Sequence, residues 1–220
     1  MSGAVLTWLL NGEPDPQRAH RWQADPGIIA ALRDSVTAHG RQLIVITDCL
    51  EETDTDLVQY VRVPPGGNPY WVRWVHALDW LRRTNVTWLW CVDGSDVEML
   101  TDPFGRMAAG RLYCGSEPHL IGHPEKGDWL RRGASPEVRQ WLAAHPDLPI
   151  LNMGTLGGDR PTMLEALGIL AARAGESDWE IGAFQQIAHE TFAGRVVTGP
   201  AVHTEFGADQ RESLAWWRHK

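Results

Sequence analysis

The sequence predicts a single α/β domain whose central, mostly parallel sheet is flanked by helices. Short apolar segments rich in β-branched and aromatic residues alternate with longer segments that place apolar residues at helical spacing. Uncharged strands of this kind suit a sheet that is buried on both faces. The length of 220 residues allows one large domain with a proper core, and neither a repeat nor a clear linker divides the chain.

The first part of the chain predicts a βαβ unit followed by a further strand. Residues 4–10 form an apolar strand, and Asp25-Pro26 is typical of a helix N-terminus, with a helix that ends at Gly40. Residues 42–48 predict the second strand, and residues 57–63 predict a third strand after an acidic loop. This order implies parallel pairing with a right-handed crossover.

A helix over residues 70–83 and a strand over residues 86–92 come next. The helix places its apolar residues on one stripe and leaves Arg73 off that stripe. The strand carries no charge and stops at Asp93-Gly94-Ser95-Asp96, a tight turn that holds two carboxylates. Because ligands usually bind at the carboxyl edge of an open α/β sheet, we expect this turn to belong to a site.

The second half of the chain has weaker signals. Residues 110–115 and 149–154 predict strands, and the second of these runs into a glycine-rich loop over residues 155–158. The polar, glycine-punctuated segment 119–133 predicts a loop able to act as a mobile lid. The remaining predicted elements are a short helix from Ser135-Pro136, helices from near Pro161 and Ser177, and a strand over residues 195–198.

Composition and charge exclude several functions. The formal net charge of −8 disfavours general binding to nucleic-acid backbones. The chain lacks a P-loop and the Gly-x-Ser-x-Gly and His-Glu-x-x-His signatures of common hydrolases. Three cysteines without a CxxC pair, Cys49, Cys91 and Cys114, indicate reduced thiols. We therefore expect a cytoplasmic protein without a signal peptide, a membrane span or a membrane partner.

Asp93 and Asp96 are the first candidates for chemistry. Carboxylates placed at a strand end can hold a hard divalent cation such as Mn²⁺ or Mg²⁺, and the cation can in turn hold phosphate oxygens. The alternative is that Asp, Gly and Ser merely end a strand, as turn chemistry often requires. Both interpretations fit this turn taken alone.

Four segments then occur in a characteristic order: residues 70–73; residues 92–97 with 102–104; residues 151–158 with 163–165; and residues 177–178 with Phe184, residues 198–206 and 217–220. Their order resembles that of GT-A-type, nucleotide-sugar-dependent glycosyltransferases. In particular it is similar to small bacterial and phage members related to the retaining enzymes with a DxD site. The acidic pair here has the spacing D-x-x-D, which leaves open which carboxylate contacts the metal directly.

The resemblance implies a GT-A-like, Rossmann-like fold with a metal site. Asp93 and Asp96 would hold Mn²⁺ or Mg²⁺ beside the diphosphate of a nucleotide sugar, and a histidine from the C-terminal part would complete the site. His203 is the first choice for that ligand and His219 the second. A strand-end histidine with a satisfied hydrogen bond is the alternative interpretation of His203.

The resemblance also implies catalytic and donor-binding residues. Asp178 and Asn152 are the catalytic candidates, although Asp178 also fits a helix N-terminus within the capping box from Ser177 to Glu180. A base could stack on an aromatic ring near the first strand ends, while glycines would let the main chain approach the sugar. The candidates for binding the nucleotide sugar are Thr7, Trp8, Asp48, Arg73, Gly157, Gly158 and Lys220.

The activity implied by the resemblance is transfer of a sugar from a UDP- or GDP-sugar to a hydroxyl acceptor, with retention of anomeric configuration. Residues 1–104 would bind the nucleotide, and residues 105–220 would hold the sugar and an acceptor on a glycan, protein or modified DNA base. One rival hypothesis keeps this chemistry but acts on 5-hydroxymethylated bases of phage DNA. A nucleotidyltransferase is another, although it normally has a basic glycine-rich loop where this chain has Asn11-Gly12-Glu13. A third is a non-catalytic binding domain.

Overall fold

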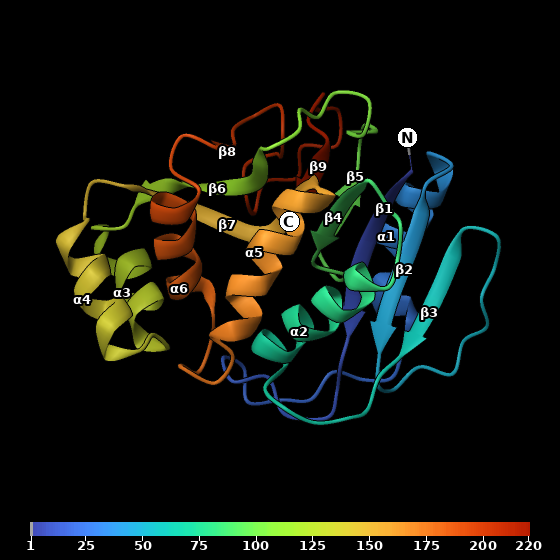
Figure 1. Ribbon diagram of the computed structural model, residues 1–220, viewed down its shortest axis with the longest axis horizontal. Coiled ribbons are helices and arrows are strands. Elements are labelled where there is room, and N and C mark those ends of the chain that lie inside the picture. Colours follow the sequence, from blue (N-terminus) through green and yellow to red (C-terminus); the bar gives the residue numbers. More distant parts are fainter. Residues whose placement is uncertain (1) are drawn as a thin grey trace.

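The computed structural model describes residues 2–220 and has one seven-stranded mixed sheet at its centre (Figure 1). The first four strands in the order below are parallel to one another, and β7 runs antiparallel to both β4 and β6. The α/β class with a mostly parallel sheet is therefore confirmed, and the architecture is compatible with a Rossmann-like fold. The order across the sheet is β3 (Val58–Arg62), β2 (Gln42–Thr47), β1 (Gly3–Leu9), β4 (Trp88–Val92), β7 (Pro149–Asp159), β6 (Leu112–Leu120) and β8 (Val196–Val197).

Helices cover both faces of this sheet. Helices α2 and α5 pack side by side on one face, α1 lies on the opposite face, and α3, α4 and α6 gather at the end formed by β6 and β7 (Figure 1). The helical segments are the 3₁₀ turn η1 (Pro26–Ile29), α1 (Ala30–Ala38), α2 (Pro69–Arg82), α3 (Pro124–Arg132), α4 (Pro136–Ala144), α5 (Arg160–Ala172), α6 (Ile181–Gln186) and the π-helical turn η2 (Ile187–Thr191).

Two hydrophobic cores result, one on each face of the sheet. Successive side chains of a strand point to opposite faces, so Leu6 of β1 packs in the core under α2 and α5, whereas Val5 packs in the core under α1. Tryptophans fill much of both cores. The buried ones are Trp8, Trp71, Trp74, Trp80, Trp88, Trp90, Trp141, Trp216 and Trp217.

A second, two-stranded sheet joins the middle of the chain to its C-terminal segment. Strand β5 (Val97–Met99) follows the acidic turn and pairs antiparallel with β9 (Trp217–His219). The register places Val97 opposite His219, and the backbone N–H of Lys220 donates to the carbonyl of Asp96 at 2.9 Å. The pairing therefore brings the last residues of the chain to the turn after β4.

Two predicted loops are wrong. The segment 155–158 belongs to strand β7, where Gly157 pairs with Trp90 of β4. A side chain at Gly157 would collide with the Trp90 ring, so glycine serves packing within the sheet here. The predicted lid 119–133 contains the end of β6 and helix α3, whose first turn is capped by the His123 side chain, which accepts a hydrogen bond from the backbone N–H of Lys126.

Two composition-based expectations can be compared with the structure. Cys49, Cys91 and Cys114 are all free thiols, as expected. Within residues 2–220 no helix is both long enough and apolar enough to cross a lipid bilayer.

Gly157→Ala is expected to destabilise the fold. Its added Cβ would lie 2.4 Å from Cδ2 of the fully buried Trp90, and overpacking of this kind costs about 1–3 kcal/mol. Gly168→Ala in α5 is the control, because its Cβ meets nothing within 4 Å and alanine favours a helix over glycine by roughly 0.5–1 kcal/mol. Urea unfolding would measure both; equal stability of the two variants would contradict the proposed packing.

Candidate metal centre and cleft

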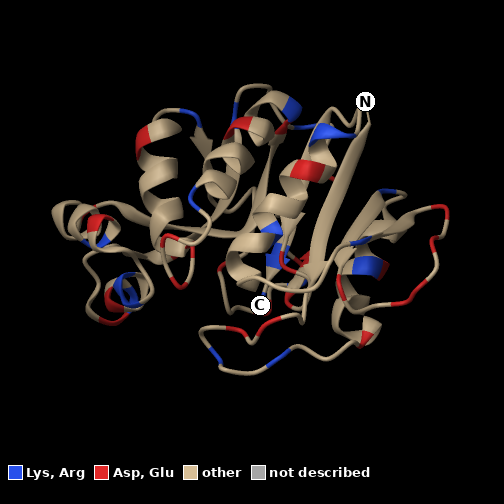
Figure 2. Ribbon diagram, turned by 60° about the horizontal axis from the view of Figure 1, so that its bottom comes forward, with Lys and Arg blue, Asp and Glu red and all other residues tan. Residues whose placement is uncertain are grey.

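A cleft of about 530 Å³ opens beyond the carboxyl ends of β1 and β4. Its lining includes the end of β1, the acidic turn after β4, part of β7, and residues of α2 and α3. Figure 2 shows acidic residues alongside a few basic ones around the C-terminus, which lies near this edge of the sheet. The position is the one expected for a ligand site in an open α/β sheet.

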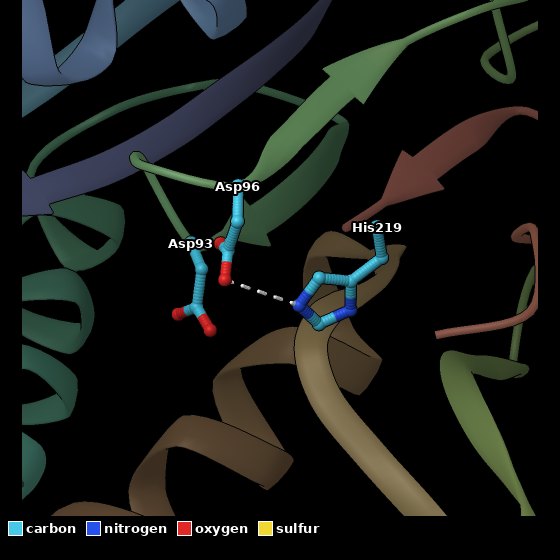
Figure 3. Close-up of side chains that lie close together, drawn as sticks. All are labelled: Asp93, Asp96 and His219. Carbon is cyan, nitrogen blue, oxygen red and sulfur yellow. Dashed lines mark ion pairs between the residues drawn. The ribbon is translucent and has the colours of Figure 1, made fainter. Parts of the chain in front are cut away.

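Asp93, Asp96 and His219 converge at this cleft (Figure 3). Each offers one ligand atom, and the three atoms lie within 4.8 Å of one another. Asp93 directly follows β4 and its backbone N–H donates to the carbonyl of Gly154 at 2.9 Å, while Asp96 directly precedes β5. Strand β9 supplies His219, whose Nε2 lies 3.8 Å from Oδ2 of Asp96.

The polar atoms of this cluster fit a divalent cation. Nε2 of His219 faces Oδ2 of Asp96 at 3.8 Å, a distance too long for a hydrogen bond but short enough for both atoms to contact one ion. Burial and the neighbouring charge of Asp93 raise the pKa of Asp96 to about 6, against the opposing effect of His219. Two carboxylates and an imidazole form a donor set suited to Mn²⁺ and similar ions, and carboxylates alone suit Mg²⁺. A cation would remove the electrostatic cost of placing these carboxylates together.

Gly154 keeps the space beside the cluster open. A Cβ at this position would lie 2.4 Å from Cε1 of His219 and 2.8 Å from Oδ2 of Asp93. No ordinary side chain fits at those distances, so glycine is required for the approach of the main chain.

Arg73 joins the cluster to a buried carboxylate. Its Nη1 donates to Oδ1 of Asp93 at 2.8 Å, and its Nη2 pairs with Glu180. Burial alone would lower the pKa of Arg73, but the charges of Glu180 and Asp93 outweigh burial and raise it, so the guanidinium stays charged. Burial raises the pKa of Glu180 although Arg73 acts in the opposite direction. Both residues line the cleft, beside Trp8, whose ring lies 5.2 Å from the guanidinium carbon.

The structure brings His219, and not His203, to the two aspartates. Nε2 of His203 accepts a hydrogen bond from the backbone N–H of Ser116 at 2.7 Å, and His203 does not belong to the group formed by Asp93, Asp96 and His219. Burial, with a smaller effect of the charge of His219, lowers the pKa of His203 to about 4 and keeps it neutral. His203 thus matches the alternative interpretation, a buried histidine with a satisfied hydrogen bond.

Three predicted binding residues, and the predicted catalytic residue Asp178, do not line the cleft. Thr7 is buried and donates to the carbonyl of Val92. The carboxylate of Asp48 accepts from two backbone N–H groups of the loop after β1, and Nζ of Lys220 lies 2.7 Å from Glu98. Asp178 is exposed, and its carbonyl accepts from Asn68.

Gly157 and Gly158 lie inside β7 and do not line the cleft. Their small size serves the packing of neighbouring strands. The predicted site residues that do line the cleft are Trp8, Arg73, Asp93, Asp96 and Asn152.

Several cleft residues were not predicted. Glu180 was placed behind Asp178 as a catalytic carboxylate and was interpreted mainly as part of a helix cap. Lys126 and Trp129 lay in the segment expected to be a lid, and Glu117 was given no role. The pair His123-Pro124, an N-cap followed by a proline at the first helical position, was the signal that could have revealed α3.

No protein-family model matches the sequence, and a search of curated proteins finds no significant match. The interpretation of the site therefore depends on its geometry and chemistry.

Loss of a cluster residue is expected to weaken metal binding. Asp96→Asn and His219→Gln should each lower Mn²⁺ affinity by at least about tenfold, since even residues behind the ligands typically contribute that much. Asp102→Asn is the control, because Asp102 pairs with Arg41 and is not part of the cluster. Electron paramagnetic resonance of free Mn²⁺ measures the affinity. Unchanged affinity in both cluster variants would exclude this metal site.

Asp96→Asn is also expected to change stability with pH in the absence of metal. The pKa of Asp96 is about 6 when folded and 3.8 ordinarily, so its favourable contribution is present at low pH and is lost as the pH rises through 6. The variant stays neutral and should be more stable than the unmodified protein at pH 8, by about 1–2 kcal/mol. The difference should shrink at pH 5. Urea unfolding in EDTA measures both; a difference that does not depend on pH contradicts the assignment.

Proposed function

We propose that the chain is a divalent-cation-dependent glycosyltransferase of the GT-A type that takes a sugar from a nucleotide-diphosphate sugar, UDP- or GDP-linked, to a hydroxyl acceptor. One observation carries the proposal: Asp93, Asp96 and His219 offer ligand atoms within 4.8 Å of one another at a cleft on the carboxyl edge of the sheet. The order of the four segments that resemble this family supports it independently.

The chemistry of the reaction explains why a cation site is needed. The bond between the anomeric carbon and the diphosphate breaks, and negative charge develops on the departing phosphate oxygen. Asp93, Asp96 and His219 would hold Mn²⁺ or Mg²⁺, which supplies the positive charge that stabilises this leaving group. Arg73 would hold Asp93 in place through its ion pair. The expectation that configuration is retained belongs to this proposal.

The cleft also offers surfaces for the nucleoside. Trp22 and Ile28 are only partly buried and line the cleft, so they leave an apolar surface on which a base can stack. Arg18 also lines the cleft, and its half-exposed guanidinium makes one long ion pair of 3.4 Å with Asp15. Arg18 would therefore be free to contact a phosphate.

The loop after β1 argues against a nucleotidyltransferase. In such an enzyme the backbone N–H groups of this loop would hold phosphate oxygens. Here the N–H groups of Asn11 and Gly12 both donate to the Asp48 carboxylate at 2.8 Å. A carboxylate already occupies the place that a phosphate would need.

The proposal predicts that donor binding requires metal. We expect UDP or GDP, or a sugar carried by one of them, to raise the melting temperature with Mn²⁺ and to have little effect in EDTA, because a ligand that binds only the folded state stabilises it. A thermal-shift screen measures this. Asp96→Asn should abolish the shift, whereas Asp102→Asn should preserve it.

Turnover would be measured as release of UDP or GDP from the donor that binds. NMR spectra would give the anomeric configuration of the product. A shift that is the same with Mn²⁺ and in EDTA, or pyrophosphate release from a nucleoside triphosphate and a sugar phosphate, would overturn the proposal.

A further inference from the structure

We propose that the side of the cleft formed by β6 and α3, here called the α3 wall and defined by Glu117, Glu125, Lys126, Trp129 and Arg132, is a subsite for an uncharged carbohydrate acceptor. All five residues line the cleft. The inference rests on the proposed function and names the chemical class of the second substrate.

Glu117 provides a hydrogen-bond acceptor that the fold leaves available. Its side chain on β6 is only 7% exposed, and its Oε1 accepts from Nδ2 of Asn152 at 2.9 Å. Its Oε2 makes no hydrogen bond to any of residues 2–220; the closest cation is Nζ of Lys126, at 4.0 Å. Because Glu117 lines the cleft, this free oxygen can accept a hydrogen bond from a ligand hydroxyl.

Asn152 connects Glu117 to the group of Asp93, Asp96 and His219, here called the metal corner. Its Oδ1 accepts from the backbone N–H of Gly154 at 2.8 Å, while its Nδ2 donates to Glu117. Gly154 is the residue whose Cβ would collide with His219 and approach Asp93. The Asn152 side chain thus links the group that would bind the hydroxyl to the strand segment beside the proposed metal site.

Trp129 supplies a flat apolar surface beside Glu117. The ring is half-buried, so it packs against the core and also lines the cleft. Helix α3 lies close enough to β6 for this because it has glycine at position 127, where a Cβ would be 2.0 Å from the carbonyl oxygen of Ile121. An aromatic face next to a hydrogen-bonding group suits a ring that has both apolar and hydroxyl-bearing surfaces.

The charge of the α3 wall favours an uncharged ligand. Glu117 and Glu125 balance Lys126 and Arg132, so the wall offers no net positive charge to a phosphate-bearing polymer. The same balance argues against DNA as the acceptor. A neutral pyranose with several hydroxyls can use both the carboxylates and the cations as hydrogen-bond partners.

The test uses saturation-transfer NMR with methyl α- and β-glycosides of glucose, galactose, mannose and N-acetylglucosamine, in the presence of Mg²⁺ and UDP. We expect at least one glycoside to bind, and Glu117→Gln and Trp129→Leu each to raise its dissociation constant by about tenfold or more. Glu137→Gln is the control: it lies on the neighbouring helix α4, is exposed, does not line the cleft, and should change nothing. Far-UV circular dichroism and binding of UDP with Mg²⁺ show that each variant is folded.

The outcomes separate this inference from the proposed function. If UDP binds with Mg²⁺ but no glycoside does, or if glycoside binding survives both substitutions, the α3 wall is not the acceptor site and the proposed function stands. If a glycoside binds and neither UDP nor GDP does, the acceptor role fails together with the proposed function. Binding of an oligonucleotide that competes with the glycoside would overturn the assignment to an uncharged acceptor.

Discussion

The metal corner depends on the short ladder between β5 and β9, because only this pairing brings His219 to Asp96. The ladder is held by an ion-pair network around Arg218, which is fully buried and pairs with both Glu98 and Asp209. A buried guanidinium is tolerated only when carboxylates compensate it, so β9 can dock in one register. These ion pairs fix the C-terminal segment with the His219 imidazole beside Asp96. The geometry of the metal corner therefore depends on Arg218, which does not itself line the cleft.

Charge balance explains why the corner is suited to a divalent ion. Arg73 is the buried cation between Asp93 and Glu180, and it can compensate one of these two carboxylates. Asp96 adds a third carboxylate, whose raised pKa reflects the lack of compensation. The three carboxylates and one guanidinium leave two negative charges when all are ionised, which is the charge that Mn²⁺ or Mg²⁺ would offset. Coupling through Arg73 also means that changes at Glu180 reach the metal ligand Asp93.

Local patterns predicted what depends on local sequence. The uncharged run that ends at Asp93 showed both the central strand and the acidic turn, and the apolar stripe of α2 left Arg73 free to face the cleft. The histidine that joins Asp93 and Asp96 could not be chosen by such patterns, because long-range strand pairing decides between His203 and His219. Helix α3 was missed because the glycines on either side of it read as loop signals. The glycines after Gly154 were misread for a related reason: Gly157 accommodates Trp90 across the sheet, and Gly158 approaches the carbonyl of Arg111, contacts that no local pattern contains.

Strand β7 links the core of the sheet to the cleft through an irregularity in its pairing. Cys114 of β6 pairs with Leu156, but the next residue, Gly115, pairs with Asn152, so β7 leaves its neighbour over residues 153–155. Bulges of this kind bend a strand and redirect its residues. Here the displaced segment moves toward β4, where the carbonyl of Gly154 accepts from the N–H of Asp93. Asn152 stays on the β6 side and holds Glu117. Two residues of one irregular strand, Asn152 and Gly154, thus connect the α3 wall to the turn that carries Asp93, so the fold holds the two proposed subsites in a fixed relation.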